Sequence, residues 1–349
     1  MTYDYFIVGA GLAGICFSEV ALQENKRFFV FDKGVSSSAV APGVFNAVIL
    51  KRFTLSLSAK KQLVLLNEFY PKIEQRLGIS LMHHLPTLRR LASFEEQNNF
   101  IVASDKPLFS DFLSADIIHK DFKYIQAPFG FGQMKQTGYI EVKKLLTSFK
   151  EFLLENNSLC EEEFDFSKLN VYEDYVEYEG KKAKNIIFAE GFGMKQNPYF
   201  PDLPLDGTKG EILIIRAADL DLDVMLKSDI FILPLGGGIF KVGATYNWDD
   251  KTSDRTEGGK QELVELLKKT IDSDFEIIDH LAGIRPTVKD RRPIVGRHPD
   301  YKNMYLLNGL GTRGVMLGPY LAQNLFNAIE FDVPLSEEIN VNRFYKKNK

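Results

Sequence analysis

The residues near the start of the chain that could carry chemistry are glycines. The run Gly9-Ala10-Gly11-Leu12-Ala13-Gly14 follows an apolar stretch at 3–8 and opens a helix candidate over 12–23. The first glycine of such a run permits a tight turn, the second lets the backbone approach a pyrophosphate, and the third lets the helix pack on the strand. The helix N-terminus adds amide donors and positive partial charge. The run therefore predicts a dinucleotide-binding turn.

An acidic residue follows in the place where such a turn needs one. Asp32 closes a second apolar run at 28–31, and Lys33 comes directly after it. A carboxylate at the end of the second strand can accept hydrogen bonds from ribose hydroxyls. Two strands joined by a helix make a βαβ unit, which NAD and FAD both use.

A second glycine-rich turn decides between the two cofactors. A strand candidate at 304–307 leads through Gly309, Gly311 and Gly314 into a helix candidate over 315–329. A long cofactor approached from both of these turns fits FAD, whereas nicotinamide dehydrogenases usually bring a separate downstream domain. A helix whose N-terminus faces the pyrimidine edge of the isoalloxazine would stabilise the charge that develops there on reduction. We therefore expect FAD.

The segments between these turns alternate in character. Helical spacing at 59–77 ends at Gly78, and it returns at 142–153. Short aromatic runs with prolines at 80–139, including the loop 129–132, predict strands and loops, and β-type runs at 210–245 predict an antiparallel sheet. We expect an α/β fold in which a Rossmann-like FAD-binding domain (1–80, 140–205 and 280–349) is interleaved with an antiparallel-sheet-rich substrate domain (81–139 and 206–279).

Composition limits the other function classes. The 349 residues are 45% hydrophobic and 26% charged with a net charge of -4, so no general electrostatic attraction to nucleic acid is expected. Cys16 and Cys160 lie far apart, and His83-His84 lack metal-ligand spacing, so we expect no metal. The sequence has no apolar stretch of about 18 residues. We expect a cytoplasmic protein that does not span a membrane.

In order along the chain, these landmarks resemble the FAD-dependent D-amino-acid oxidase superfamily, which includes glycine oxidase and sarcosine oxidase. The matching segments are 9–14 with Asp32, the loop from Ser37-Ser38 to Gly43, and 187–191, 243–245, 283–286 and 309–314. The stretch 310–314, followed by a Pro-containing helix, is more similar to the flavin domain of the bifunctional tRNA enzyme that makes 5-methylaminomethyl-2-thiouridine. We expect no counterpart of that enzyme's methyltransferase half in these residues.

The resemblance implies oxidation of a C–N bond by hydride transfer from a substrate carbon to flavin N5. Arg285 matches the family arginine that grips a substrate carboxylate, Tyr246 could line the substrate cavity with Trp248, and Lys51 could lie near N5. Each has a plainer alternative: an ion pair with an aspartate for Arg285, a packing role for the aromatic residues, and a solvated charge for Lys51.

The same resemblance places further cofactor contacts along the chain. Beyond the first turn with Asp32 and Lys33, they are Ser38, Gly43, Glu190, Gly191, Gly309, Gly311, Thr312, Arg313, Gly314 and Val315. Glu190 departs from the family, in which Thr or Ala is commoner. Neither cysteine lies in a segment expected near the isoalloxazine, so the FAD is expected to be non-covalent.

The sequence favours an enzyme that oxidises a small amine or amino acid. Two alternatives stay open: a tRNA wobble-uridine-modifying flavin oxidoreductase, and a flavoprotein that carries electrons without its own amine substrate. The oligomeric state and the electron acceptor stay open as well.

Overall fold

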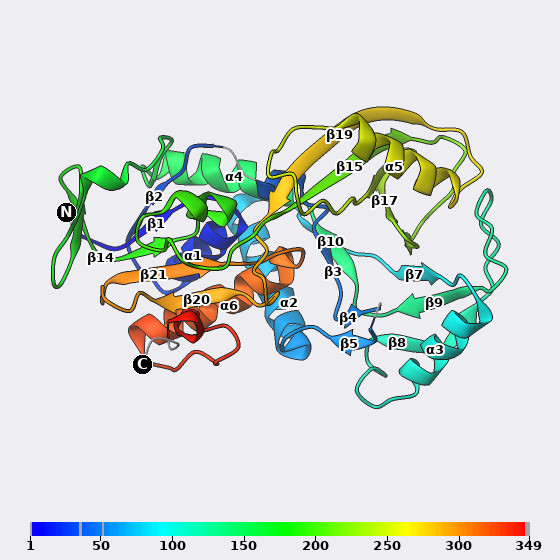
Figure 1. Cartoon of the computed structure of the whole chain (residues 1–349), viewed down its shortest axis with the longest axis horizontal. Coiled ribbons are helices and arrows are strands. Elements are labelled where there is room, and N and C mark those ends of the chain that lie inside the picture. The colour runs from blue at the N-terminus through cyan, green and yellow to red at the C-terminus, as the bar shows by residue number, and fades with distance from the viewer. Residues whose placement is uncertain (1, 35–36, 51, 346–349) are drawn as a thin grey trace.

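A computed structural model describes residues 2–34, 37–50 and 52–345. In these residues two eight-stranded sheets make up the two halves of an elongated molecule, joined by smaller sheets and by strands that pass between the halves (Figure 1). The fold class predicted from the sequence, α/β with both parallel and antiparallel sheets, is confirmed. The boundaries of the two domains stay a prediction.

The first sheet is built around five parallel strands. They lie in the order β11 (Leu159–Cys160), β2 (Phe28–Phe31), β1 (Thr2–Val8), β14 (Lys181–Phe188) and β21 (Met304–Asn308). Antiparallel to their neighbours are β12 (Leu169–Val171), β13 (Val176–Tyr178) and β20 (Ile294–Arg297). All four residues of β2 are buried, as expected where a parallel sheet is covered on both faces. Parallel strands bring their carboxyl ends to one edge, so the turns after β1, β14 and β21 are neighbours.

Helices cover one face of this sheet and aromatic residues the other. The helices are α1 (Leu12–Gln23), α2 (Ala59–Leu77), α4 (Val142–Glu155) and α6 (Gly314–Glu330). Ile7, Ile187 and Leu307 point into this helical layer. Phe6 and Phe188 point to the opposite face, where they pack with β12, β13 and the short turns η2 (Phe166–Lys168), η3 (Gly191–Gln196) and η4 (Val341–Phe344).

The second sheet is mostly antiparallel. Its order is β19 (Glu276–Arg285), β15 (Thr208–Arg216), β18 (Ile239–Gly243), β17 (Phe231–Gly236), β16 (Met225–Lys227), β7 (Thr87–Arg90), β9 (Phe131–Met134) and β8 (Leu113–Ile118). α5 (Glu257–Lys268) packs on one face through Leu263 and Leu267. In Figure 1, β19 and β15 reach from this half to the middle of the molecule.

Small sheets lie where the halves meet. β3 (Val44–Phe45) and β6 (Met82–His84) pair with β10 (Gly138–Ile140), and β4 (Val48–Ile49) pairs with β5 (Thr54–Leu55). The turn η1 (Ser37–Val40) packs against β19, because a Cβ on Gly283 would lie 3.6 Å from Ser37 and 3.5 Å from Val40. The loop after β2 therefore reaches the second sheet.

The structure corrects two predicted segments and adds a helix, α5, that the sequence did not predict. The stretch 80–139, predicted as strands and loops, contains the helix α3 (Phe94–Ser104), and the predicted loop 129–132 instead leads into β9. α5 lies within the range predicted to be rich in sheet. α3 buries few residues, so its helical periodicity is weak, and two of the first three residues of α5 are glycines, which disfavour a helix. The local signals of the two helices are their N-caps, Ser93 and Thr256. None of the helices described here is both long enough and apolar enough to cross a bilayer.

Helices α1 and α6 approach closely because glycines face α1. A Cβ on Gly318 would lie 2.7 Å from Cys16 Sγ, and one on Gly314 would lie 3.0 Å from Leu12 Cδ2. Cys16 is fully buried, and its burial raises the pKa of the thiol. The contact between Gly314 and Leu12 joins the first residues of the two helices, so their N-termini are side by side.

We predict that Gly318→Val destabilises the protein by about 1–3 kcal/mol, because overpacking in a filled core forces neighbouring atoms apart. The matched control is Gly258→Val in α5, where a Cβ would meet no atom within 4 Å. Thermal unfolding followed by circular dichroism should show a lower Tm for Gly318→Val alone. Equal Tm values for the two variants would contradict the close packing described here.

Candidate active site

The turn after β1 has the geometry that its glycines predict. Gly9 has a φ of +100°, and a Cβ there would lie 2.7 Å from the carbonyl oxygen of Ala189. A Cβ on Gly14 would lie 1.8 Å from the carbonyl oxygen of Gly9. Only glycine fits at either position without moving backbone. The first turn of α1 is thereby held against the carboxyl ends of β1 and β14.

The N-terminus of α1 is open to an anion. Its N-cap Gly11 provides no side-chain cap, and no acidic residue stands in the first turn. The amides of Gly11, Ala13 and Gly14 donate to no described residue. The amide of Leu12 donates to Ser38 Oγ at 3.3 Å, which places the predicted Ser38 at this helix end. Free amides at a helix N-terminus, with the positive end of the helix dipole, bind phosphate groups.

Asp32 lies beneath this turn and is largely buried. Its carboxylate accepts hydrogen bonds from the amides of Ala10 at 2.8 Å and Gly34 at 3.0 Å, and it pairs with the ammonium of Lys150 from α4. Sequence reasoning missed Lys150, because only the packing of α4 against this edge brings it there. A carboxylate offers about four acceptor positions, so these three contacts leave room for a ribose hydroxyl.

The turns after β14 and β21 are joined by Asn308, which sequence reasoning also missed. Its Nδ2 donates to the carbonyl of Gly191 at 2.9 Å, and its Oδ1 accepts from the amide of Gly309 at 2.7 Å. Next to Gly191, burial raises the pKa of the Glu190 carboxyl to about 7, although Asn197 donates to it at 2.7 Å. The predicted Glu190 and Gly191 thus lie at the same sheet edge as the first turn.

The second glycine turn leaves another helix end open. Gly309 and Gly311 have φ values of +77° and +55°, and α6 begins after Arg313 without a side-chain cap or an acidic residue in its first turn. The amides of Thr312, Gly314 and Val315 donate to no described residue. The Tyr70 hydroxyl donates to the carbonyl of Val315 at 2.9 Å, which fixes this helix end from below. Two open helix N-termini therefore lie next to each other.

Arg285 ends β19 with an unusual set of partners. Its Nη1 donates to the carbonyls of Lys209 and Thr245, both at 3.2 Å, and its guanidinium stacks 4.5 Å from the ring centre of Tyr246. Its guanidinium crosses Gly210, where a Cβ would lie 1.9 Å from Nη2. No carboxylate of the described residues lies within ion-pair distance, so the ion-pair alternative for Arg285 is wrong. Burial lowers the pKa of this guanidinium.

Arg313 also has a backbone carbonyl, and no carboxylate, as its partner. Its Nη1 donates to the carbonyl of Asn46 at 3.2 Å, it pairs with no carboxylate of the described chain, and burial lowers its pKa. The phenol of Tyr246 raises the pKa of both Arg285 and Arg313, against the effect of burial. Both arginines are thus partly buried cations without a carboxylate partner among the described residues.

Other predicted residues have plainer surroundings. Lys33 forms an exposed ion pair with Glu163 at 2.6 Å, although it is close enough to lower the pKa of Glu190 slightly. Gly43 has a φ of +75°, and a Cβ there would lie 1.9 Å from the carbonyl oxygen of Ile140, so its role is to let β3 meet β10. Lys51 lies outside the described residues.

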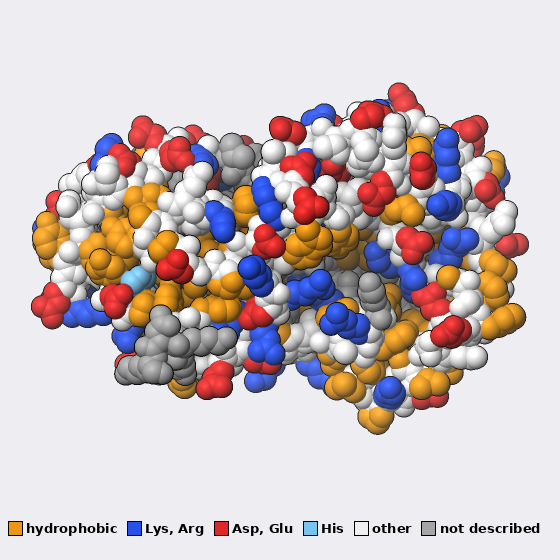
Figure 2. All heavy atoms as spheres, viewed as in Figure 1, with side chains coloured by type: hydrophobic (Ala, Val, Ile, Leu, Met, Phe, Trp, Pro, Cys, Tyr) orange, Lys and Arg blue, Asp and Glu red, His pale blue; other side chains and the backbone are white. Residues whose placement is uncertain are grey.

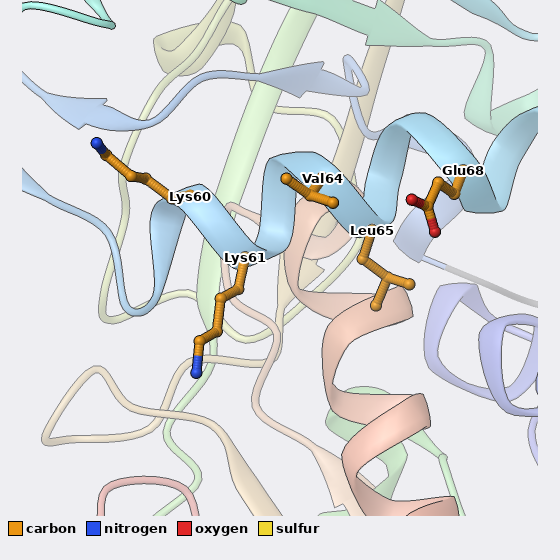
Figure 3. Close-up of a pocket in the computed structure, with 5 residues that line it drawn as sticks. All are labelled: Lys60, Lys61, Val64, Leu65 and Glu68. Atoms are coloured by element: carbon orange, nitrogen blue, oxygen red, sulfur yellow. The ribbon is translucent and has the colours of Figure 1, made fainter.

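A hollow of about 310 Å³ lies along the outer face of α2 (Figure 3). It is lined by five residues of that one helix: Lys60, Lys61, Val64, Leu65 and Glu68. None of the predicted site residues lines it, so we assign it no ligand. The described chain also holds no cluster of three His, Cys, Asp or Glu side chains that could bind a metal.

A different part of the surface is hollowed near the middle of the molecule, where Figure 2 shows Lys and Arg side chains gathered around the depression.

The residues present fit FAD. A glycine cradle and free amides at α1 would hold the pyrophosphate, and Asp32 stands where it could accept from the adenosine ribose. The open N-terminus of α6, where Arg313 is the N-cap, would face the flavin, and Arg285 and Tyr246 come from segments of the second sheet.

Comparisons with known proteins agree with this geometry. Residues 4–327 match the family model described as FAD dependent oxidoreductase (DAO). Glycine oxidase from Bacillus subtilis is 22% identical over 97% of this chain and 94% of its own length. The tRNA 5-methylaminomethyl-2-thiouridine biosynthesis bifunctional protein of Shewanella sediminis is 25% identical over 50% of this chain, and the match spans only 30% of that relative's length.

Solved structures show the same fold over nearly the whole chain. Glycine oxidase from Geobacillus kaustophilus superposes with a TM-score of 0.77 at 18% identity, covering 94% of this chain and 95% of that one. Iminodiacetate oxidase from Chelativorans superposes with a TM-score of 0.77 at 16% identity, covering 96% and 98%. With the family match, the open helix ends and the glycine cradle, these likenesses lead to one conclusion: the chain belongs to the DAO family of FAD-dependent oxidoreductases.

Proposed function

We propose that this protein oxidises the C–N bond of a small amino acid, with Arg285 as the anchor for the substrate carboxylate. The observation behind the proposal is that most donors of this guanidinium have no partner in the described chain. Only Nη1 donates to the described chain, and it donates to carbonyls; Nε and Nη2 donate to nothing described. Burying an arginine without an anion is costly, because its charge is retained. A substrate carboxylate would supply the missing partner through two parallel hydrogen bonds.

The side chains of the protein contribute to the reaction by positioning the substrate. Arg285 and Arg313 hold the anionic end of the substrate, and the stacked Tyr246 limits where its carbon and nitrogen can lie. Bound FAD supplies the acceptor, since flavin N5 can take a hydride from the substrate carbon. The imine product then hydrolyses in water. We propose that the FAD is bound without a covalent link, because Cys16 is buried between helices and Cys160 lies on β11 at the far side of β2.

A second candidate is oxidation of a carboxymethylamino group on a wobble uridine. The similarity to the bifunctional tRNA-modifying relatives favours it, and such a group also carries the carboxylate that Arg285 would bind. The net charge of -4 gives no general attraction to tRNA. A flavoprotein that only carries electrons is a third possibility. Anaerobic bleaching of the flavin by free amino acids supports the first reading; bleaching only by tRNA carrying the modified base supports the second, and no bleaching by either supports the third.

We predict that Gly11→Val loses FAD while the chain still folds. A β-branched side chain at the N-cap of α1 would occupy the space that a pyrophosphate needs. The purified wild-type protein should be yellow, and acid should release its flavin. The measurement is the flavin-to-protein absorbance ratio, with far-UV circular dichroism as the control for folding. Stoichiometric FAD in the variant would show that the glycine turn does not hold the cofactor.

We predict that Arg285→Met weakens the binding of an amino-acid substrate and leaves FAD content unchanged. Removing the anchor of a buried carboxylate costs about 2–5 kcal/mol, which is roughly 30-fold or more in affinity. The measurement is the substrate concentration that gives half-maximal anaerobic flavin reduction, with glycine and N-methylglycine as the first compounds tested. Arg285→Lys should recover only part of the loss, because one ammonium cannot form the paired bonds of the guanidinium.

The control for this prediction is the matching amine without its carboxylate, methylamine or dimethylamine. Wild type and Arg285→Met should differ little with these amines, because the group that the arginine binds is missing. Equal half-saturation by the amino acid in both proteins would remove Arg285 from the site.

A further inference from the structure

The lysine beside the proposed anchor is fully buried. The side chain of Lys209 on β15 is 0% exposed, and its Nζ lies 2.6 Å from Asp250 Oδ2 and 3.3 Å from Thr252 Oγ1. Lysine is rarely buried, and a buried ammonium is costly unless it is paired. Its partners come from the loop 244–256 between β18 and α5, which also carries Tyr246. We call this segment the Tyr246 loop.

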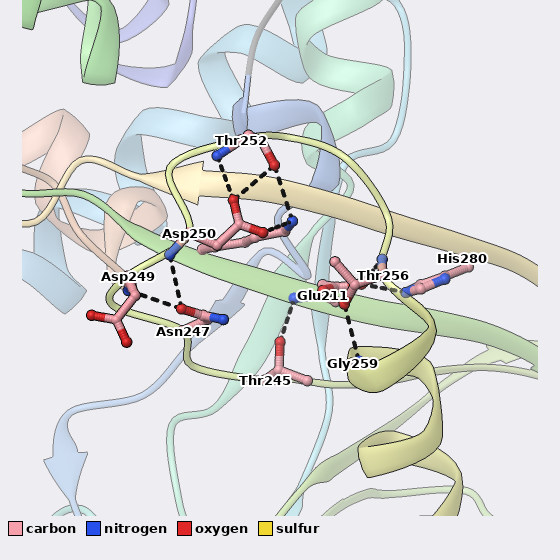
Figure 4. A network of polar contacts seen from close by, with 10 residues as sticks. Glu211, Thr245, Asn247, Asp249, Asp250, Thr252, Thr256, Gly259 and His280 are labelled. Carbon is pink, nitrogen blue, oxygen red and sulfur yellow. Dashed lines mark hydrogen bonds and ion pairs between the residues drawn. The ribbon is translucent and has the colours of Figure 1, made fainter.

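The Tyr246 loop lies across β15 in a tightly bonded arrangement (Figure 4). The backbones of Lys209 and Asn247 exchange two hydrogen bonds, at 2.9 Å and 3.0 Å. Asn247 Oδ1 accepts from the amides of Asp249 and Asp250, at 2.9 Å and 3.0 Å. Asp250 Oδ1 accepts from the amide and the hydroxyl of Thr252, both at 2.8 Å. The carboxylate that meets Lys209 is therefore preorganised by its own loop.

The same lysine also contacts the anchor. The carbonyl of Lys209 accepts from Arg285, while its ammonium binds Asp250 four residues beyond Tyr246. Lys209 therefore contacts Arg285 through its backbone and the Tyr246 loop through its side chain.

The side chain of Tyr246 has few contacts of its own. Its side chain is 61% exposed, and its hydroxyl makes no hydrogen bond to a described residue. The position of its ring against Arg285 therefore depends on the course of the loop. The loop has further tethers on both sides of the tyrosine. Before it, Thr245 Oγ1 accepts from the amide of Glu211 at 2.9 Å, and the amide of Thr245 donates to the carbonyl of Glu211 at 3.2 Å. After it, Lys251 forms a partly exposed ion pair with Asp206 at 3.0 Å, and Glu211 binds Thr256 at the start of α5.

We propose that the Lys209–Asp250 ion pair is a positioning element that holds Tyr246 against Arg285 and so sets the affinity of the site for a carboxylate. The part that concerns affinity rests on the proposed function; the part that concerns the loop does not. Asp250 and Lys209 are positioning residues, since neither side chain reaches the guanidinium itself.

The chain offers a direct probe of the loop, because Trp248 is its one tryptophan. In the holoenzyme, Asp250→Asn should raise the accessibility of Trp248 to acrylamide quenching above that of wild type. The same variant should raise the acetate concentration that half-saturates the change in flavin absorbance by at least about threefold. FAD content should stay normal. Asp250→Glu keeps the charge and should restore most of both properties.

Two further variants sharpen the test. Asp223→Asn breaks the exposed pair with Lys120, whose Nζ lies 3.0 Å from the carboxylate, and should change neither readout. If the ion pair acts through the tyrosine, Asp250→Asn should weaken acetate binding no further in a Tyr246→Ala background. Additive effects in that cycle would overturn the proposal.

Two further results would overturn the proposed role of the ion pair. Wild-type quenching of Trp248 in Asp250→Asn would overturn the proposal, and so would a loosened loop with unchanged acetate binding. If Asp250→Asn does not fold, the double variant Lys209→Met/Asp250→Leu removes both charges and should fold with the same loosened loop. Failure of the proposed function is seen separately, as wild-type acetate binding by Arg285→Met or as no acetate response at all, and the quenching experiment still tests the loop.

Discussion

The candidate site depends on how closely two helices approach one edge of a parallel sheet. A side chain at Gly14 would collide with the backbone of Gly9, and one at Gly318 would collide with the sulfur of Cys16. These glycines let α1 and α6 start side by side above the carboxyl ends of β1, β14 and β21. Each helix start carries amides without partners in the described chain. An extended cofactor with a pyrophosphate in its middle and an electron-accepting ring at one end matches this pair of open helix ends.

The sequence predicts the parts of the site that depend on local spacing. The turn 9–14, Asp32 and the second turn at 309–314 need only a strand, a few glycines and a helix, so they can be recognised from neighbouring residues. Helix α2 was predicted with its observed bounds, since its apolar spacing and the glycine after it are both local signals. The domain boundaries and the roles of the individual site residues stay predictions.

What the sequence could not show depends on contacts between distant segments. Lys150 reaches Asp32 from 118 positions away, and Asn308 bonds to Gly191 across 117 positions. The surroundings of Arg285 follow from the register of β15 against β19, which pairs Lys209 with Ile284 and Gly210 with Gly283. No spacing within the sequence specifies that register. Ser93, followed three residues later by Glu96, was a local signal that could have revealed α3, because this pattern caps helices.

The charges near the site show why a net acidic protein can still bind an acid. The guanidinium of Arg285 donates to the backbone carbonyl of Lys209, yet of these two residues only Lys209 has a protein carboxylate as its partner. Pairing with Asp250 neutralises the charge of the lysine, so the lysine does not compete for an incoming anion. Arg285 is left with its charge, a stacked ring and free donors. The division of partners between the two residues makes the arginine, and not the lysine, the place where a substrate carboxylate would gain most by binding.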